Sequence, residues 1–185
     1  MDFKKYGVHT PRDLFDFFYK NLRYGFTYRN KVFTENNPDF QADMDRLYKL
    51  RLGEDFIKNK YGVCWDFCEL EREFFEGAGI EHECYYVEAF EDRHEGGPTH
   101  TFALFKEDAK WKWFEYSWGL YMGIWEYESK EKALADIVEK FRVCSNDANP
   151  ENLKLFKTNK IKNRLDTFKF VEHCYKGIPI EIPTK

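Results

Sequence analysis

The chain lacks the sequence signals of a secreted, membrane-spanning or nucleotide-binding protein. Its first residues contain no apolar core of a secretory signal, and no apolar run approaches the length of a membrane span. There is no Walker loop, no dinucleotide-binding fingerprint and no GxSxG nucleophile elbow. We therefore expect a cytoplasmic protein with no cofactor and no membrane partner, and the pattern disfavours a serine hydrolase.

Paired cysteines are also lacking. The chain has 5 Cys, an odd number, and none of them forms a CxxC pair. Cys64 and Cys68 are separated by three residues and no second pair follows, so a zinc site is disfavoured and we predict no metal. Reduced thiols are the expected state of these cysteines.

No strong excess of one charge is present. The formal net charge is -4 and the sequence pI is about 5.8, which gives no support to a nucleic-acid partner. One basic stretch without acids runs from Asn152 to Leu165. We interpret it as a solvated edge, with a phosphate-contacting surface as the alternative.

Aromatic residues, by contrast, are abundant. They make up 19% of the 185 residues, which excludes disorder and predicts a ring-rich core in one domain spanning residues 1–185. No repeat and no βαβ alternation is visible. Helical patterns come first and strand patterns follow, so we expect an α+β fold with a helix packed on an antiparallel sheet.

Helices are predicted from apolar spacing and end signals. One begins at Thr10-Pro11 and a second at Asn37-Pro38, which Gly53 breaks and a short turn over Glu54–Lys58 follows. A third runs over Cys64–Glu76 and stops at Gly77 and Gly79. Two more are expected over Ser129–Val143 and Asp166–Tyr175.

Strands are predicted where alternation replaces helical spacing. The expected strands are Glu83–Phe90, Thr99–Lys106, Lys110–Tyr116 and Leu153–Lys157, with an extended tail over Ile178–Ile182. Tyr24–Phe33 is expected to be irregular or briefly extended, and Asp92–Pro98 to be a loop. The domain core spans about 12–120, and the role of residues 125–185 is unassigned.

Cys64 is the candidate nucleophile because it falls where a Gly-containing turn enters a helix. A helix N-terminus offers free N–H groups and a positive partial charge, and both favour a thiolate. The other cysteines are interpreted as packing residues, namely Cys68, Cys84, Cys144 and Cys174.

His100 is the candidate base and Glu115 the candidate orienting acid. His100 opens a strand on the same face as Phe102 and Leu104, a face expected to pack on a helix. Glu115 ends a row that begins with two Trp on the next strand, where an imidazolium partner would compensate for its burial. His94 is the reserve base, and His9, His82 and His173 are the remaining histidines.

These residues resemble motifs of the transglutaminase-like superfamily, whose fold is related to papain. Gly62-Val63-Cys64-Trp65-Asp66-Phe67 resembles the nucleophile helix, Gly77-Ala78-Gly79-Ile80 its exit, and Thr99-His100-Thr101-Phe102 the base strand. Trp111-Lys112-Trp113-Phe114-Glu115 resembles the acid strand, with Glu where the family has Asp, and Asn21-Leu22-Arg23-Tyr24 resembles the segment before the Cys region. The likeness covers about residues 12–120 and is closest to small uncharacterised bacterial members.

The resemblance implies a Cys–His–acid triad on a helix packed against an antiparallel sheet. Members of the family act as protein crosslinkers, cysteine peptidases, amidases, peptide N-glycanases or non-catalytic domains, so the resemblance alone does not choose among them. We predict a cysteine-dependent hydrolase, a peptidase or amidase, that acts on a peptide or protein carboxamide through a thioester at Cys64, because no sequence feature indicates the exclusion of water that transfer to an amine requires. The alternatives are a protein-glutamine acyltransferase and a non-catalytic binding module that keeps the fold.

Around the predicted triad, Trp65 and Trp118 are expected to wall the cleft. The backbone N–H of Cys64 is the expected first oxyanion donor. The second donor stays open between Gln41, a Tyr and a Trp.

Overall fold

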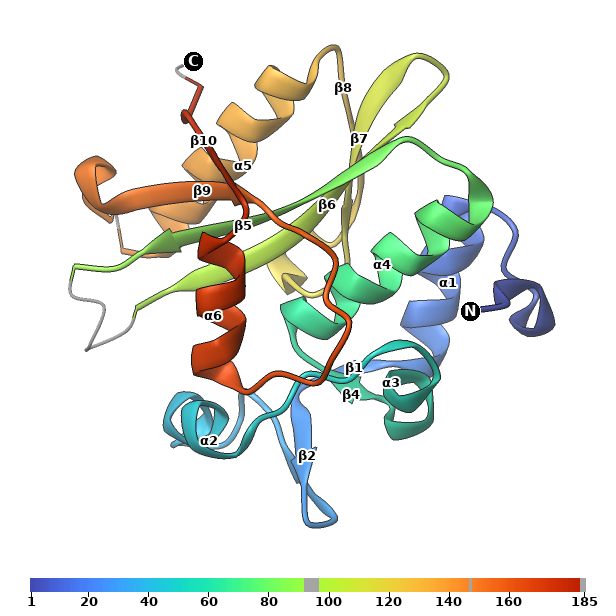
Figure 1. The fold of residues 1–185 in the computed structure, drawn as a ribbon, viewed down its shortest axis with the longest axis vertical. Helices are drawn as coiled ribbons and strands as arrows, with labels where there is room; N and C mark the ends of the chain where they lie inside the picture. Colours follow the sequence, from blue (N-terminus) through green and yellow to red (C-terminus); the bar gives the residue numbers. More distant parts are fainter. Residues whose placement is uncertain (92–96, 147, 184–185) are drawn as a thin grey trace.

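The fold is mixed α+β, as expected, in a computed structural model that describes residues 1–91, 97–146 and 148–183 (Figure 1). The helices are α1 (Pro11–Asn21), α2 (Phe40–Leu47), α3 (Gly53–Asn59), α4 (Cys64–Ala78), α5 (Lys130–Cys144) and α6 (Thr167–Tyr175). The strands are β1 (Arg23–Tyr24), β2 (Phe26–Tyr28), β3 (Lys31–Phe33), β4 (Tyr61–Gly62), β5 (His82–Ala89), β6 (Thr99–Glu107), β7 (Lys110–Glu115), β8 (Gly123–Tyr127), β9 (Leu153–Lys157) and β10 (Ile178–Ile180). Short 3-10 turns cover Phe3–Tyr6, Gly119–Tyr121 and Pro150–Asn152.

A 6-stranded antiparallel sheet in the order β10-β9-β5-β6-β7-β8 forms the centre of the described structure. The β6–β7 connection is a two-residue turn in which Asp108 and Ala109 adopt φ values of 53° and 63°. Such left-handed pairs match the twist of the strands that they join. The tight hairpin fixes the register, which sets the start of β6 beside the end of β7.

Helices cover both faces of this sheet (Figure 1). On one face α4 and α1 pack on side chains such as Ala103, Phe105 and Phe114. On the other face α5 packs on Phe102 and Leu104 from the same strand, because alternate residues point to opposite faces. A third cluster joins α2, α6 and the first turn of α4. The start of α4 therefore lies where the separate cores meet.

The helix predicted from Asn37-Pro38 ends earlier than its apolar spacing suggested. Helix α2 stops at Leu47, and the Tyr48 hydroxyl and the Arg51 N–H donate instead to Asp66 of α4. Gly53 does not break a helix but begins α3, with φ of 48°. Tertiary hydrogen bonds outweigh the local pattern here.

The exit of the Cys helix also differs slightly from the prediction. Gly77 lies inside α4, and the chain turns at Gly79, which adopts a left-handed φ of 68°. Glycine adopts this conformation without a Cβ penalty, so Gly79 is the residue that ends the helix. The predicted strands and the two later helices are confirmed to within two residues at each end.

Residues 125–185 belong to the same structure as the rest of the chain. Strands β9 and β10 extend the central sheet beside β5, and α5 covers one of its faces. Strand β8 lies at the opposite edge and was not predicted, because its apolar residues do not alternate regularly. No helix in the described ranges is long and apolar enough to cross a membrane.

Candidate active site

Cys64 is the first residue of α4 and directly follows the short strand β4. Strand β4 pairs in parallel with β1, where Tyr24 is opposite Gly62. A side chain at Gly62 would collide with the ring of Phe56, so glycine is needed at this approach. As the first helical residue, Cys64 has a backbone N–H with no intrahelical acceptor.

The structure brings Cys64, His100 and Glu115 together. The His100 Nε2 atom is 2.7 Å from Oε2 of Glu115, and both side chains are buried. The side chain of Cys64 interacts with the same imidazole and contributes to the raised pKa of His100, and both residues line one cleft. Because Glu115 engages Nε2, the nitrogen left for the thiol is Nδ1. The imidazole thus lies between a thiol and a carboxylate.

The strand register explains how a Glu reaches His100. Ala103 pairs with Phe114 across β6 and β7, so continuing the register sets Glu115 opposite Phe102. His100 is then a diagonal neighbour, at a spacing of roughly 7–8 Å that long side chains can span. The extra methylene of Glu, compared with Asp, serves this diagonal contact.

The remaining carboxylate oxygen of Glu115 is held by the turn that follows β7. Its Oε1 atom accepts hydrogen bonds from the Ser117 hydroxyl at 3.0 Å and from the Trp118 N–H at 2.8 Å. The Trp118 ring lies 4.9 Å from the His100 ring, at a tilt of 58°. Ser117 and Trp118 therefore fix the carboxylate, and Trp118 also covers the imidazole.

Electrostatics favour a protonated His100. Burial alone would lower its pKa, but the Glu115 charge and the hydrogen bonds to Cys64 and Glu115 raise the pKa from 6.5 to about 10. An imidazolium beside a helix-terminal cysteine favours the thiolate form of that cysteine. The arrangement therefore sets a positive charge directly beside Cys64.

A second buried acid, Asp66, anchors the first turn of α4. Its carboxylate accepts hydrogen bonds from the N–H of Val63, the hydroxyl of Tyr48 and the N–H of Arg51, each at 2.7 Å. Burial raises the pKa of Asp66 to about 7, although these hydrogen bonds oppose that rise. Asp66 thus ties the segment after α2 to the peptide that precedes Cys64.

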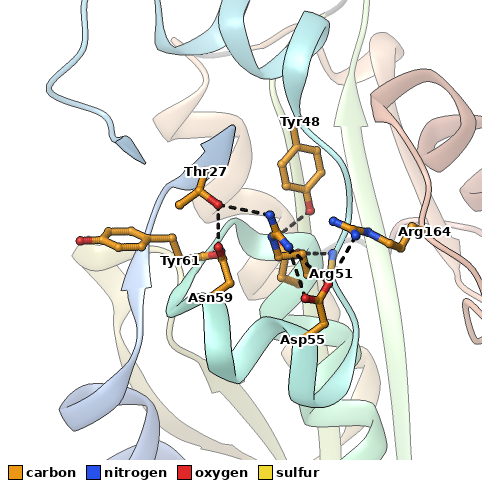
Figure 2. Close-up of polar contacts among 8 residues, drawn as sticks. Thr27, Tyr48, Arg51, Asp55, Asn59, Tyr61 and Arg164 are labelled. Carbon is orange, nitrogen blue, oxygen red and sulfur yellow. Dashed lines mark hydrogen bonds and ion pairs between the residues drawn. The ribbon is translucent and has the colours of Figure 1, made fainter. Parts of the chain in front are cut away.

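Around Arg51 this anchor extends into a polar network (Figure 2). The Arg51 guanidinium donates to Thr27 at 3.2 Å and pairs with Asp55 at 3.3 Å. Arg164 approaches Asp55 at 3.6 Å from the C-terminal part of the chain. Thr27 in turn donates to Asn59 of α3. The network connects β2, α3 and the segment before α6. Through the hydrogen bond from the Arg51 N–H to Asp66 it also reaches the start of α4.

An open cleft with two lobes lies over Cys64. The first lobe, of about 130 Å³, is lined by Phe40, Gln41, Met44, Trp65, Pro98 and others. The second, of about 190 Å³, is lined by Glu35, His100, Trp118, Cys144, Ser145 and others. Tyr24, Cys64 and Thr99 line both lobes. The candidate nucleophile therefore lies between two spaces, of which only the second contains His100.

The two tryptophans expected to wall the cleft differ in their roles. Trp118 lines the second lobe beside His100, as expected. Trp65 borders the first lobe, but its side chain is only 2% exposed and stacks on Phe170 at 3.8 Å between ring centroids. The Trp65 side chain thus mainly attaches α6 to the start of α4.

Tyr24 is a cleft residue that the sequence did not single out. It lies at the junction of the two lobes, and no hydrogen bond to its hydroxyl is found among the described residues. Burial, followed by the negative groups Cys64, Glu35, Glu115 and Asp66, holds its pKa well above the ordinary value of 10. Tyr24 therefore stays protonated and can donate. Its position depends on β1–β4 pairing, which joins residues far apart in sequence.

The interpretation of Cys144 as a buried packing residue is wrong. Cys144 is exposed at the last turn of α5, where its thiol lies 3.8 Å from the Tyr121 hydroxyl and borders the second lobe. The other three are buried, as expected: Cys68, Cys84 and Cys174. The apolar stripe of α5 ends at Phe141, so its last turn no longer faces the core.

The other histidines have different surroundings. His82 and His173 bond to the backbone carbonyls of Ile80 and Asn159, at 2.8 Å and 3.0 Å. His9 is exposed before α1. His94, the reserve base, and most of the predicted loop around it lie outside the described residues.

The basic stretch after Asn152 is largely paired with acids. Lys154 pairs with Glu88, Lys157 with Glu83, Lys160 with Glu76 and Arg164 with Asp55. These pairs offset the charge that would attract phosphates. Among the residues in the described ranges, no group of three or more His, Cys, Asp and Glu is placed to hold a metal ion.

Comparison with known proteins gives no relative on which to base a function. No family model, no curated protein and no solved structure matches this chain.

Proposed function

We propose that this protein is a cysteine-dependent hydrolase that cleaves a carboxamide or peptide bond through a thioester at Cys64. The observation that carries the proposal is the chain of contacts from Cys64 through His100 to Glu115, at the base of an open cleft. A thiolate, a proton donor beside it and an acid that orients the donor are the groups that thiol acyl transfer requires.

In the first step the Cys64 thiolate attacks the carbonyl carbon of the substrate. A C–S bond forms, and the carbonyl oxygen takes up the negative charge of a tetrahedral intermediate. The intermediate then breaks its C–N bond as the Nδ1 proton of His100 passes to the leaving nitrogen. The products of this step are a free amine and a thioester on Cys64.

Two donors are available to the developing oxyanion. One is the N–H of Cys64, whose peptide is held through the Val63 carbonyl, which accepts hydrogen bonds from the N–H groups of Asp66 and Phe67. We assign the other to the hydroxyl of Tyr24, a residue that lines both lobes as Cys64 does and that stays protonated. Donors aimed at charge that appears only in the transition state accelerate the step.

In the second step His100 takes a proton from water, and the resulting hydroxide attacks the thioester carbon. The C–S bond breaks, the carboxylic acid leaves, and the proton held by His100 restores the imidazolium beside the thiolate. An amine entering the second lobe instead of water would give transfer rather than hydrolysis. Hydrolysis is preferred because the second lobe is open to solvent.

Trapping the acyl-enzyme tests the proposal. The protein is mixed with p-nitrophenyl acetate in a Cys144→Ser background, quenched in acid and analysed by intact and peptide mass spectrometry. We expect one acetyl group on Cys64, formed in a burst, and slow regain of the free thiol in water. The His100→Asn variant is expected to lose the burst.

The matched control is Cys64→Ser, which should show no acetyl thioester. Acetylation spread over surface lysines, or a burst that survives His100→Asn, would contradict the proposal. Adding glycinamide separates the two outcomes of the thioester, because transfer yields acetyl-glycinamide whereas hydrolysis yields acetate alone.

A further inference from the structure

The proposed function, on which this inference rests, gives the two lobes of the cleft different chemical roles. The amine that leaves in the first step must receive its proton from His100. His100 lines the second lobe and not the first. The leaving group therefore occupies the second lobe, and the acyl part occupies the first.

One carboxylate in the second lobe has no evident structural role. Glu35 is exposed in the segment between β3 and α2 and lines this lobe. Among the described residues no ion pair or hydrogen bond engages it, unlike the other acids of the site. Its charge acts on Tyr24, whose pKa rises in response to burial first and then to Cys64 and Glu35.

The charge balance of the second lobe is negative. Among the residues that the structure describes, its lining contains no Lys and no Arg. Among the described residues of this lining, Glu35 is the one carboxylate, and the charge of protonated His100 is compensated by the buried Glu115 at 2.7 Å. A cleft lined by charge of one sign attracts a ligand of the opposite sign.

We propose that the second lobe selects a leaving group that carries a positive charge beside its reacting nitrogen, with Glu35 as the specificity-determining residue. In a peptide substrate this group is a residue with a cationic side chain directly after the cleaved bond. Apart from Cys64, which both lobes share, the described lining of the first lobe consists of neutral side chains, so charge selection belongs to the leaving-group side alone.

Acyl transfer to matched amines tests this selection directly. An accepting amine occupies the lobe that the leaving amine vacates, because its attack reverses the departure. In that step the amine nitrogen attacks the thioester carbon, its proton passes to His100, a C–N bond forms and the C–S bond to Cys64 breaks. The acetyl-enzyme from p-nitrophenyl acetate is therefore offered argininamide or the neutral isostere citrullinamide.

We expect argininamide to capture roughly two- to five-fold more acetyl groups than citrullinamide, the range for one exposed ion pair. The preference should vanish in Glu35→Gln and shrink in 1 M salt. It should persist in Asp39→Asn, because Asp39 is an exposed acid of the same segment that lines neither lobe. Equal capture in the unaltered protein, or a preference unchanged in Glu35→Gln, would overturn the assignment.

A second measurement needs no turnover and so separates this inference from the proposed function. Cys64 is modified in the Cys144→Ser background by a trimethylammonium-ethyl or a sulfonatoethyl methanethiosulfonate. We expect the cationic reagent to react faster, and the rate ratio to fall in Glu35→Gln. If the protein shows this rate ratio but forms no acyl-enzyme, the charge selection stands and the proposed hydrolase function is refuted. If the rate ratio is the same in Glu35→Gln, the charge selection is refuted.

Discussion

At the scale of single residues, the contact between His100 and Glu115 determines what the site can do. The diagonal register and the hydrogen bonds from Ser117 and Trp118 make Glu, rather than Asp, the acid that fits this turn. The substitution of Glu for the acid that the resembled family uses is thus compatible with an oriented imidazole.

Replacing Glu115 by Gln should change the pH dependence of amide cleavage. The pKa of His100 is raised, so its protonated form persists above 6.5 and is lost as the pH rises through about 10. Without the Glu115 charge, burial lowers that pKa, so the basic limb of acylation by 4-nitroacetanilide should move to lower pH by roughly 1–3 units.

Two comparisons make this shift specific. The Glu126→Gln variant, which alters an exposed acid of β8 paired with Lys110, should keep the limb in place. Acylation by p-nitrophenyl acetate should show a much smaller shift, because its leaving group needs no proton. An unchanged limb in Glu115→Gln would remove Glu115 from the site.

The Tyr24 hydroxyl can be tested by contrasting two reactions of the same thiol. Acylation by an ester passes through an oxyanion, whereas alkylation by iodoacetamide does not. In Tyr24→Phe we expect the acylation rate of Cys64 to fall roughly 100-fold, as for the loss of one oxyanion donor. The alkylation rate should stay the same.

Tyr28→Phe is the matched control, since Tyr28 is a half-buried tyrosine of the neighbouring strand and lines neither lobe. Equal loss in both reactions would mean that Tyr24 serves packing rather than the oxyanion.

At the scale of elements, the start of α4 depends on a single carboxylate. Both oxygens of Asp66 accept hydrogen bonds, so an amide would set its NH₂ group against at least one donor. We expect Asp66→Asn to lower the free energy of unfolding by roughly 1–3 kcal/mol, measured by urea denaturation.

Asp55→Asn provides the comparison, because Asp55 belongs to the same network but is half exposed, and should cost less than about 1 kcal/mol. If the two variants were equally stable, Asp66 would not anchor the start of α4.

The elements also show which parts of the site the sequence could predict. Cys64, His100 and Glu115 were found because a helix start and two strands joined by a short hairpin are local patterns. Tyr24 and Glu35 were missed because β1 joins β4 only by long-range pairing, and exposed residues such as Glu35 carry no periodic signal. Cys144 was misjudged because helical spacing does not reveal where a core ends.

At the scale of the whole molecule, the C-terminal part of the chain packs against the first turn of α4, next to the candidate site. Trp65, next to the candidate nucleophile, stacks on Phe170 of α6 with an interplanar angle of 10°. Strands β9 and β10 carry α6 back to the central sheet. Residues 125–185 therefore contribute to the position of Cys64, although the sequence assigned them no role.

Removing the Phe170 ring should destabilise the protein and loosen α4. Phe170→Ala is expected to lower the free energy of unfolding by roughly 3–5 kcal/mol, measured by thermal or urea denaturation. Phe168→Ala is the control within the same helix, since Phe168 is 72% exposed and should change the free energy by less than about 0.5 kcal/mol. Similar losses in both variants would contradict the assigned packing of α6.

The proposed function requires Cys64 to be an activated thiol, and competition between two cysteines of one molecule tests that activation. Cys144 is exposed, whereas Cys64 is buried but paired with His100. Labelling with limiting iodoacetamide at pH 6.5, read by peptide mass spectrometry, should modify Cys64 before Cys144, and His100→Asn should reverse the order. Faster labelling of Cys144 in the unaltered protein, or an order that stays the same in His100→Asn, would mean that His100 does not activate Cys64.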